Sequence, residues 1–321
     1  MNLDSMQDIA NAARREGKKF WEIILETDMA NRGVSRGQSL DKMAQAWHVM
    51  REASNVYTGE RRSLSGLAGG QGKLMHEYAA ADPIGGEFMA QVIAEALSMG
   101  ESNACMRRVV AAPTAGSCGV MPAVLIPLYW RENLSEEKML EAMFTASGIG
   151  AVIAFRASIS GAAGGCQAEI GSASAMAAGA LVHLRGGNTD QICHAVAMAL
   201  KNLLGLACDP VAGLVEVPCI KRNVIGAVNA IAAADMALAG ITSRIPVDEV
   251  IDAMDEVGRR LPMELKETAL GGLANTPTGR QIKEHMASGK KKQRVLTIKD
   301  ARWKLEKKPE EAPETPEEQE A

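Results

Sequence analysis

Polar and apolar positions alternate with the period of an α-helix over most of this chain. In residues 3–30, the apolar side chains Ile9, Ala13, Phe20 and Ile24 recur at helical spacing, which predicts one amphipathic helix. The same pattern, with cap and breaker residues at the ends, predicts seven more helices. These span residues 38–57, 86–110, 135–155, 167–184, 189–203, 223–238 and 246–260.

The composition agrees with an all-α fold. Hydrophobic residues make up 47% of the chain but aromatic residues only 3%. Ala, Leu and Met favour helices, whereas strands favour β-branched and aromatic residues. We therefore expect a compact domain of closely packed helices rich in Ala, Gly and Met.

Breaks in the pattern suggest three parts. Residues 1–57 form N-terminal helices, and residues 58–285 form the main helical domain. Residues 286–321 are first basic and then acidic, and end in PEEAPETPEEQEA. Such a segment has too little apolar surface to pack, so we expect it to be disordered.

Charge and hydropathy argue against two partners. The net charge is -4 and no basic stripe crosses the body, which argues against nucleic acid. Residues 109–130 carry no charge, but Pro113, Pro122 and Pro127 predict a buried soluble segment and no membrane span. The first residues are amphipathic and lack an apolar leader, so we expect a cytoplasmic protein whose six cysteines are thiols or metal ligands.

Two loops have the composition of anion sites. Residues 61–73, RRSLSGLAGGQGK, offer backbone amides and hydroxyls that can surround an anion, or simply a flexible connection. Residues 112–122, APTAGSCGVMP, precede an apolar helix. A helix N-terminus attracts carboxylates, although an ordinary helix cap would have the same composition.

Three cysteines lie beside helix-breaking residues. Cys166 follows a run of glycines, Cys208 precedes Asp-Pro, and Cys219 follows a proline. Their separations match neither a zinc ribbon nor a ferredoxin ladder. Glycine lets a bulky ligand approach the backbone, but packing of free thiols in the core is the alternative. Cys105 and Cys193 lie within predicted helices and are expected to pack.

Five stretches together resemble the alpha chain of iron–sulfur-dependent L-serine dehydratase, over about residues 55–285. They are APTAGSCGVMPA, SISGAAGGCQAEIGSASAMAAG, LKNLLGLACDPVAGLVEVPCIKRN, ADMALAGITSRIPVDEVIDAM and GGLANTPTGR. The resemblance implies a [4Fe–4S] cluster on Cys166, Cys208 and Cys219. It implies conversion of L-serine to pyruvate and ammonia, with an open iron as Lewis acid. The implied substrate-binding residues are Ser63, Ser65, Gly66, Thr114, Gly116 and Ser117.

The sequence offers no general base for this chemistry. No catalytic neighbour accompanies any of the five histidines, His48, His76, His183, His194 and His285. The resemblance implies a beta chain that supplies the base, within a higher oligomer. No cysteine occurs in the last 100 residues, so the fourth cluster position is open to water, substrate or another group.

Other interpretations stay open at this point. Lys221 and Arg222 could attract a substrate carboxylate or simply start a solvent-facing helix. The same cluster could act on another β-substituted amino acid such as cysteine or threonine. The chain could also be a non-catalytic helical subunit whose cysteines only pack.

Overall fold

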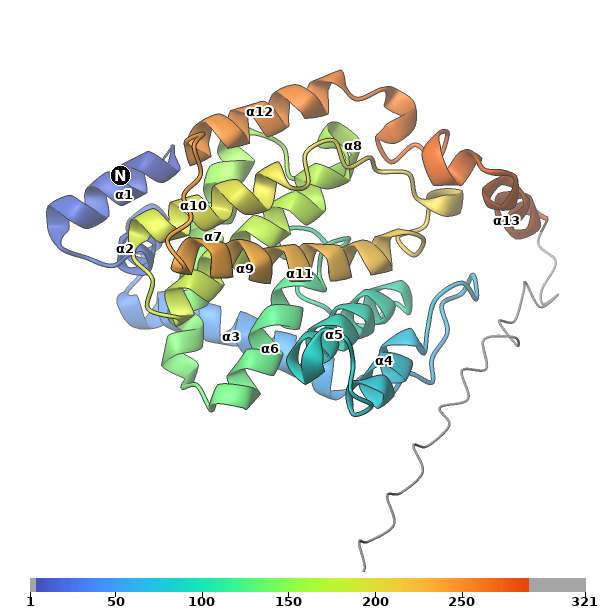
Figure 1. Ribbon diagram of the computed structural model, residues 1–321, viewed down its shortest axis with the longest axis horizontal. Coiled ribbons are helices and arrows are strands. Elements are labelled where there is room, and N and C mark those ends of the chain that lie inside the picture. The colour runs from blue at the N-terminus through green and yellow to red at the C-terminus, as the bar shows by residue number, and fades with distance from the viewer. Residues whose placement is uncertain (1–3, 289–321) are drawn as a thin grey trace, which may run out of the picture. The chain divides into compact units, whose positions relative to one another are not determined.

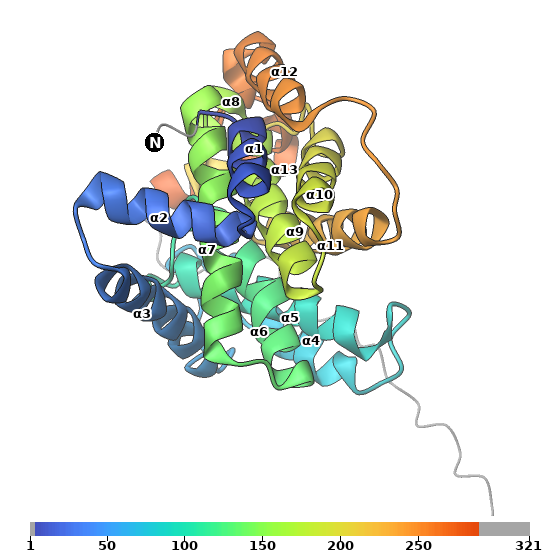
Figure 2. The same cartoon turned by 90° about the vertical axis from the view of Figure 1, so that its left-hand side faces the viewer.

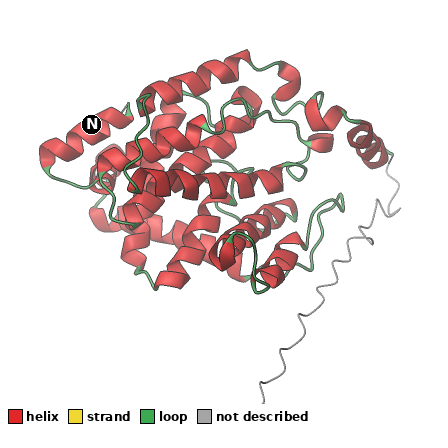
Figure 3. Ribbon diagram, viewed as in Figure 1, coloured by secondary structure: helices red, strands yellow, loops and turns green. Residues whose placement is uncertain are grey.

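The computed structural model describes residues 4–288, and within them all regular structure is helical (Figure 1, Figure 3). The expected all-α fold is confirmed. The helices are α1 (Met6–Glu16), α2 (Phe20–Arg32), α3 (Arg36–Asn55), α4 (Gln71–Ala79), α5 (Gly86–Ala104), α6 (Val120–Glu132), α7 (Glu136–Arg156), α8 (Gly161–Gly164), α9 (Ser172–Leu184), α10 (Thr189–Lys201), α11 (Cys219–Leu238), α12 (Val247–Arg260) and α13 (Pro277–Ala287). Short turns of 3₁₀ or π-helix lie at Gln167–Gly171, Val211–Gly213, Met263–Leu265 and Gly272–Asn275.

Helix α9 lies at the centre of the core and packs against α7, α10 and α11 (Figure 2). Its residues 172–182 are all buried, and most are Ala, Ser or Gly. A Cβ atom added to Gly179 would come within 2.2 Å of Ile149 on α7. The small side chains are therefore what allows these helices to approach closely, as the composition predicts.

Helix α5 packs against α4, α6 and α11, and so joins the first half of the chain to the core. The first nine residues of α6, Val120 to Leu128, are all buried, despite a proline inside the helix at Pro127. The prediction of a buried segment over residues 109–130 therefore holds for residues 117–128, whereas residues 111, 115 and 130 are exposed. Among the described helices, α7 has the length and apolar character that a membrane span needs, and 61% of its most apolar stretch is buried inside the fold.

Local conformation overturns two of the predicted boundaries. Residues 3–30 do not form one helix, because Gly17 adopts a left-handed conformation (φ 64°) that ends α1. Helix α5 ends at Ala104, so residues 107–110 are not helical. Apolar periodicity continues through both points and does not reveal either break.

Two helices lie where the sequence pattern predicts none. Helix α4 begins at Gln71, inside the predicted loop 61–73. Helix α13 begins at Pro277, where the side chain of Thr276 accepts a hydrogen bond from the Gly279 amide at 3.1 Å. The predicted tail from residue 286 lies almost wholly outside the described residues.

Candidate functional site

Three buried free thiols lie in one region of the fold. Cys166 follows α8, Cys208 lies in the loop after α10, and Cys219 is the first residue of α11. Their side chains belong to residues that are only 2%, 2% and 7% exposed. The Cys208 backbone is clamped by Leu265 and Glu267, through hydrogen bonds of 2.8 and 2.7 Å. Cys166 is electrostatically coupled to both Cys208 and Cys219, so three separate segments bring these side chains into one region.

The three thiols differ in acidity. A hydrogen bond from Cys208 lowers the pKa of Cys166, and the positive charge of Arg222 acts in the same direction. The same hydrogen bond, together with burial, raises the pKa of Cys208. Burial raises the pKa of Cys219 to about 12. Cys166 is therefore the thiol most ready to become a thiolate ligand.

Within residues 4–288, no three cysteine, histidine or acidic groups converge tightly enough to hold a single metal ion. A single zinc ion needs sulfur atoms about 2.3 Å from one centre. A cluster of several irons is wider than one ion, and thiolates are its usual ligands. Three buried thiols on separate segments are a donor set of the kind that an iron–sulfur cluster takes.

Arg222 and Asp209 fasten the Cys208 loop. Their side chains form an ion pair of 2.8 Å, and Arg222 also donates to the carbonyl of Ala207 at 2.7 Å. The other Asp209 oxygen accepts a hydrogen bond from the Leu273 amide at 2.8 Å. A Cβ atom on Gly272 would lie 2.3 Å from Asp209, so only glycine fits there. Arg222 thus faces the thiols.

Lys221, the neighbour of Arg222, is exposed on the surface. Arg222, by contrast, is half-buried, and its positive charge interacts with the thiols of Cys166 and Cys219.

The Ser63–Gly66 turn is tied to the cysteines through Glu216. Ser63 and Ser65 both donate hydrogen bonds to the same Glu216 oxygen, at 2.8 and 2.6 Å. Gly66 closes the turn with its amide bonded to the Ser63 carbonyl at 3.0 Å and φ at 77°. Glu216 lies three residues before Cys219. The first predicted substrate loop therefore touches the segment between Cys208 and Cys219.

The second predicted loop is held by Asn223. The Asn223 amide donates to the carbonyls of Gly116 and Cys219 at 2.8 and 3.0 Å, and its oxygen accepts from the Gly119 amide at 2.8 Å. Within the loop, the hydroxyls of Thr114 and Ser117 lie 3.1 Å apart. Ser117 is fully buried, whereas Thr114 is partly exposed.

Glu169 is a site residue that sequence reasoning missed. Burial raises the pKa of its carboxyl group, which also forms a hydrogen bond with Thr114. Its negative charge acts on Cys166, Cys208 and Cys219 alike. A Cβ atom on Gly116 would stand 3.3 Å from the carboxylate oxygens. Glu169 therefore lies between the thiols and the second loop.

Neither Glu169, Glu216 nor Asn223 has a sequence signal of its own. Each is a single polar residue near a cysteine, and a polar residue at such a position is most often solvent-exposed. Only their nearness to Cys166 and Cys219 in the chain could have drawn attention to them. Their roles depend on partners from distant segments, such as the Asn223 contact with Gly116.

Comparisons with known proteins agree with this geometry. The family model described as "Serine dehydratase alpha chain" matches residues 15–274. A protein of Bacillus subtilis named "Probable L-serine dehydratase, alpha chain" is 52% identical over 228 residues, which cover 71% of this chain and 76% of the relative. The "L-serine dehydratase, alpha chain" of Peptoniphilus asaccharolyticus is 42% identical over 283 residues, covering 88% of this chain and 97% of the relative.

A longer relative matches over part of its length. The protein named "L-serine dehydratase 1" in Escherichia coli is 46% identical over 181 residues, which cover 56% of this chain but only 40% of that protein. The alpha-type region is thus one portion of a larger chain there. With the family match covering the three cysteines and both loops, this chain belongs to the serine dehydratase alpha chain family.

Proposed function

We propose that this chain is the cluster-binding subunit of an L-serine dehydratase, with a [4Fe–4S] cluster bound to Cys166, Cys208 and Cys219. The observation that carries the proposal is the presence of three buried free thiols from separate segments that are electrostatically coupled to one another and to Arg222. A guanidinium next to thiolates offsets the negative charge that such ligands bring into a buried site. Family membership supports the same assignment.

When bound, the cluster supplies an open iron that acts as a Lewis acid toward the hydroxyl and carboxylate groups of L-serine. The chain itself supplies the ligands and the surrounding walls. The Asp209–Arg222 ion pair keeps the Cys208 loop in place, and Asn223 keeps the second loop against Cys219. Such fixed surroundings hold a substrate near its reactive geometry.

The substrate-binding residues in this proposal are Ser63, Ser65, Gly66, Thr114, Gly116 and Ser117. Within this set the hydroxyls have different tasks. Those of Ser63 and Ser117 are buried and hold their loops together through Glu216 and Thr114. Ser65 and Thr114 are partly exposed and can contact the carboxylate of the amino acid.

In this proposal Glu169 binds the ammonium group of the substrate. Its carboxyl group is close to Thr114 and to all three thiols, so a substrate held there meets a negative charge. A carboxylate that accepts a hydrogen bond from an ammonium group makes a strong, charge-assisted contact. This contact orients the Cα–H bond of serine relative to the cysteines.

The proposed reaction removes the α-proton and the β-hydroxide of L-serine. The product of that elimination is 2-aminoacrylate, which tautomerises to an imine, and water hydrolyses the imine to pyruvate and ammonia. The base that accepts the α-proton must reach it within hydrogen-bond distance. In this proposal that base belongs to a beta chain, because the sequence of this chain offers no histidine with a catalytic neighbour. Residues 58–285 form the catalytic part of this cytoplasmic complex, residues 1–57 its N-terminal helices and residues 286–321 a tail.

The experiment compares the anaerobically purified chain alone with the same chain plus its beta chain, using pyruvate formation from L-serine. We expect turnover only with both chains present. Equal turnover by the isolated chain would show that the base lies on this chain. L-Threonine and L-cysteine serve as matched substrates, and a higher kcat/KM with either would change the substrate assignment.

A further inference from the structure

A cavity of about 870 Å³ lies among α3, α4, α5 and α6. None of the thiols or loop residues of the candidate functional site lines it. Its volume falls within the range of about 300–1,000 Å³ that is typical of small-molecule sites. The residues that characterise it are Phe88, Glu95, Ile126, Pro127, Trp130 and Arg131.

Glu95 brings an unsatisfied carboxyl group to this cavity. The residue is only 5% exposed, and its Oε1 atom has no hydrogen-bond partner within residues 4–288. The carboxyl group forms a hydrogen bond with the side chain of Ser54, and burial raises the pKa of Glu95 to about 7. A buried polar atom without a partner is costly, and a donor group from a ligand would remove that cost.

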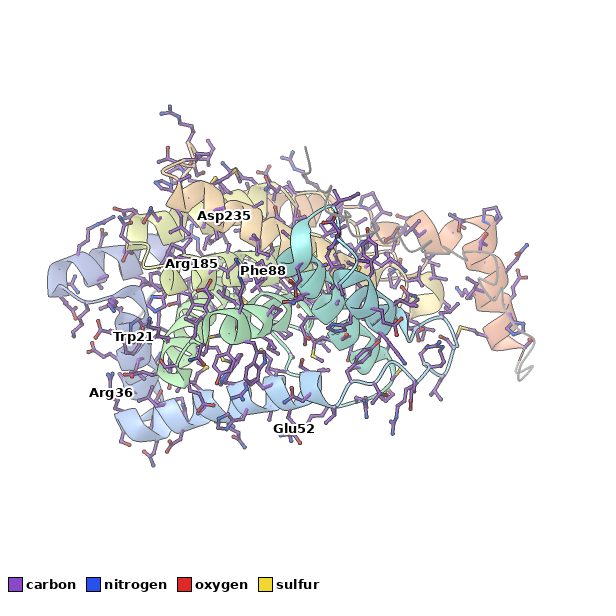
Figure 4. The ribbon with its side chains drawn as sticks, turned by 60° about the horizontal axis from the view of Figure 1, so that its bottom comes forward. Trp21, Arg36, Glu52, Phe88, Arg185 and Asp235 are labelled. Carbon is purple, nitrogen blue, oxygen red and sulfur yellow. The ribbon has the colours of Figure 1, made fainter. Side chains whose placement is uncertain are left out.

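Arg131 brings the opposite charge to the same cavity. Its guanidinium lies 4.7 Å from the centre of the Phe88 ring, which Figure 4 shows on the ribbon at the start of α5. Within the described part of the chain, Arg131 forms no ion pair. A stacked guanidinium without a carboxylate partner is well suited to bind one, because its planar fork can donate two parallel hydrogen bonds.

The two charged groups reach the same cavity from two helices. Glu95 comes from α5, and Arg131, stacked on Phe88 of α5, comes from α6. An α-amino acid carries the two complementary charges, an ammonium group for Glu95 and a carboxylate for Arg131. The cavity walls between the charges include the apolar surfaces of Ile126, Pro127 and Trp130.

We propose that this cavity binds a free α-amino acid with an apolar side chain. Its ammonium group contacts Glu95, its carboxylate contacts Arg131, and its side chain packs against Ile126, Pro127 and Trp130. The binding needs neither the cluster nor the beta chain, so it stands or falls separately from the proposed dehydratase chemistry.

The test is isothermal titration calorimetry of the full chain with L-leucine. Two matched probes are 4-methylpentanoate, which lacks the ammonium group, and 3-methylbutylamine, which lacks the carboxylate. We expect L-leucine to bind more tightly than either probe. Loss of one charged hydrogen bond corresponds to about tenfold to a hundredfold weaker binding.

Two variants assign the ends of the ligand. Glu95→Gln should weaken L-leucine by about tenfold or more while changing 4-methylpentanoate little, and Arg131→Gln should weaken L-leucine while changing 3-methylbutylamine little. Arg185→Gln is the control, since Arg185 pairs with Glu132 and does not line the cavity. Circular dichroism checks folding, and Arg131, on the exposed surface, provides the test if the Glu95 variant fails to fold.

Absence of heat with L-leucine at millimolar concentration would overturn the proposal. So would L-leucine binding that neither variant weakens. Equal binding of L-leucine and 3-methylbutylamine would also overturn it, because the site would then recognise an amine and not an amino acid.

Discussion

Asn223 gives the sharpest prediction about how the site is held together. Its side chain makes three hydrogen bonds, of 2.8 to 3.0 Å, to Gly116, Gly119 and Cys219, and the residue is 1% exposed. Asn223→Ala removes all three and leaves the buried Gly119 amide without its partner. The unsatisfied Gly119 amide costs about 1–2 kcal/mol, and each of the two other lost bonds about 1 kcal/mol. We therefore expect a loss of about 3–4 kcal/mol in the free energy of unfolding.

Urea denaturation followed by circular dichroism measures this loss. A reduction of about 3–4 kcal/mol is a large share of the 5–15 kcal/mol that stabilises a typical domain. Because Asn223 holds the second substrate loop against Cys219, the KM for L-serine should rise in the alpha–beta complex. Asn229→Ala is the matched control, since Asn229 is on the same helix and bonds Ser174 and Ala199, away from that loop.

The control should lose stability without a change in KM. If Asn223→Ala loses less than about 1 kcal/mol and keeps the wild-type KM, the hydrogen-bonded link between loop and cysteine helix is not what positions the site.

Three further predictions concern single side chains. Burial raises the pKa of Glu95 from 4.5 to about 7, so the stability it contributes at low pH is lost as the pH rises from 4.5 through 7. Glutamine has no charge to bury, so Glu95→Gln should raise the free energy of unfolding by up to about 3 kcal/mol more at pH 8 than at pH 4.5. Urea denaturation at the two pH values measures this difference, and an equal effect at both would contradict the reasoning. Gly161→Ala would place a Cβ atom 2.9 Å from both Cys208 Sγ and Glu169 Oε2. The new methyl group should displace the Cys208 thiol, so the iron bound per chain should fall. An unchanged iron content would show that the backbone shifts freely. Glu169→Gln should raise the KM for L-serine at least tenfold while iron content stays constant, and steady-state kinetics with an unchanged KM would remove Glu169 from the substrate site.

The sequence was sufficient to predict the fold class, because small helix-forming residues and apolar periodicity act locally. It did not reveal the break at Gly17, where one left-handed glycine interrupts a pattern that otherwise continues. It also missed helix α4, since a glycine-rich start such as Gly70 and Gly72 looks like a loop until the partner is known. A Cβ atom on Gly72 would meet Ser98 at 2.4 Å, so close packing and not flexibility explains that glycine.

The sequence indicated the cysteines and loops of the candidate site, whose roles stay predictions, but not the contacts that connect them. Glycine and proline neighbours distinguished Cys166, Cys208 and Cys219 from the cysteines within predicted helices, and in the structure the three are electrostatically coupled. By contrast, Glu216 and Glu169 are tied to loops about 150 and 55 residues away in the chain. No local pattern reports contacts of that kind, because they are set by packing of distant helices.

Iron and sulfide content per chain, measured after anaerobic reconstitution, tests the central claim most directly. Wild-type protein should contain about four iron and four sulfide atoms per chain, and Cys208→Ser should lose most of both. Cys118→Ser is the matched control, because Cys118 is also buried, with its pKa raised by burial to about 12, and its thiol donates to the Met99 carbonyl at 3.7 Å. The control should bind the full cluster. Wild-type protein without iron, or a Cys208→Ser variant that binds as much iron as the control, would contradict the account.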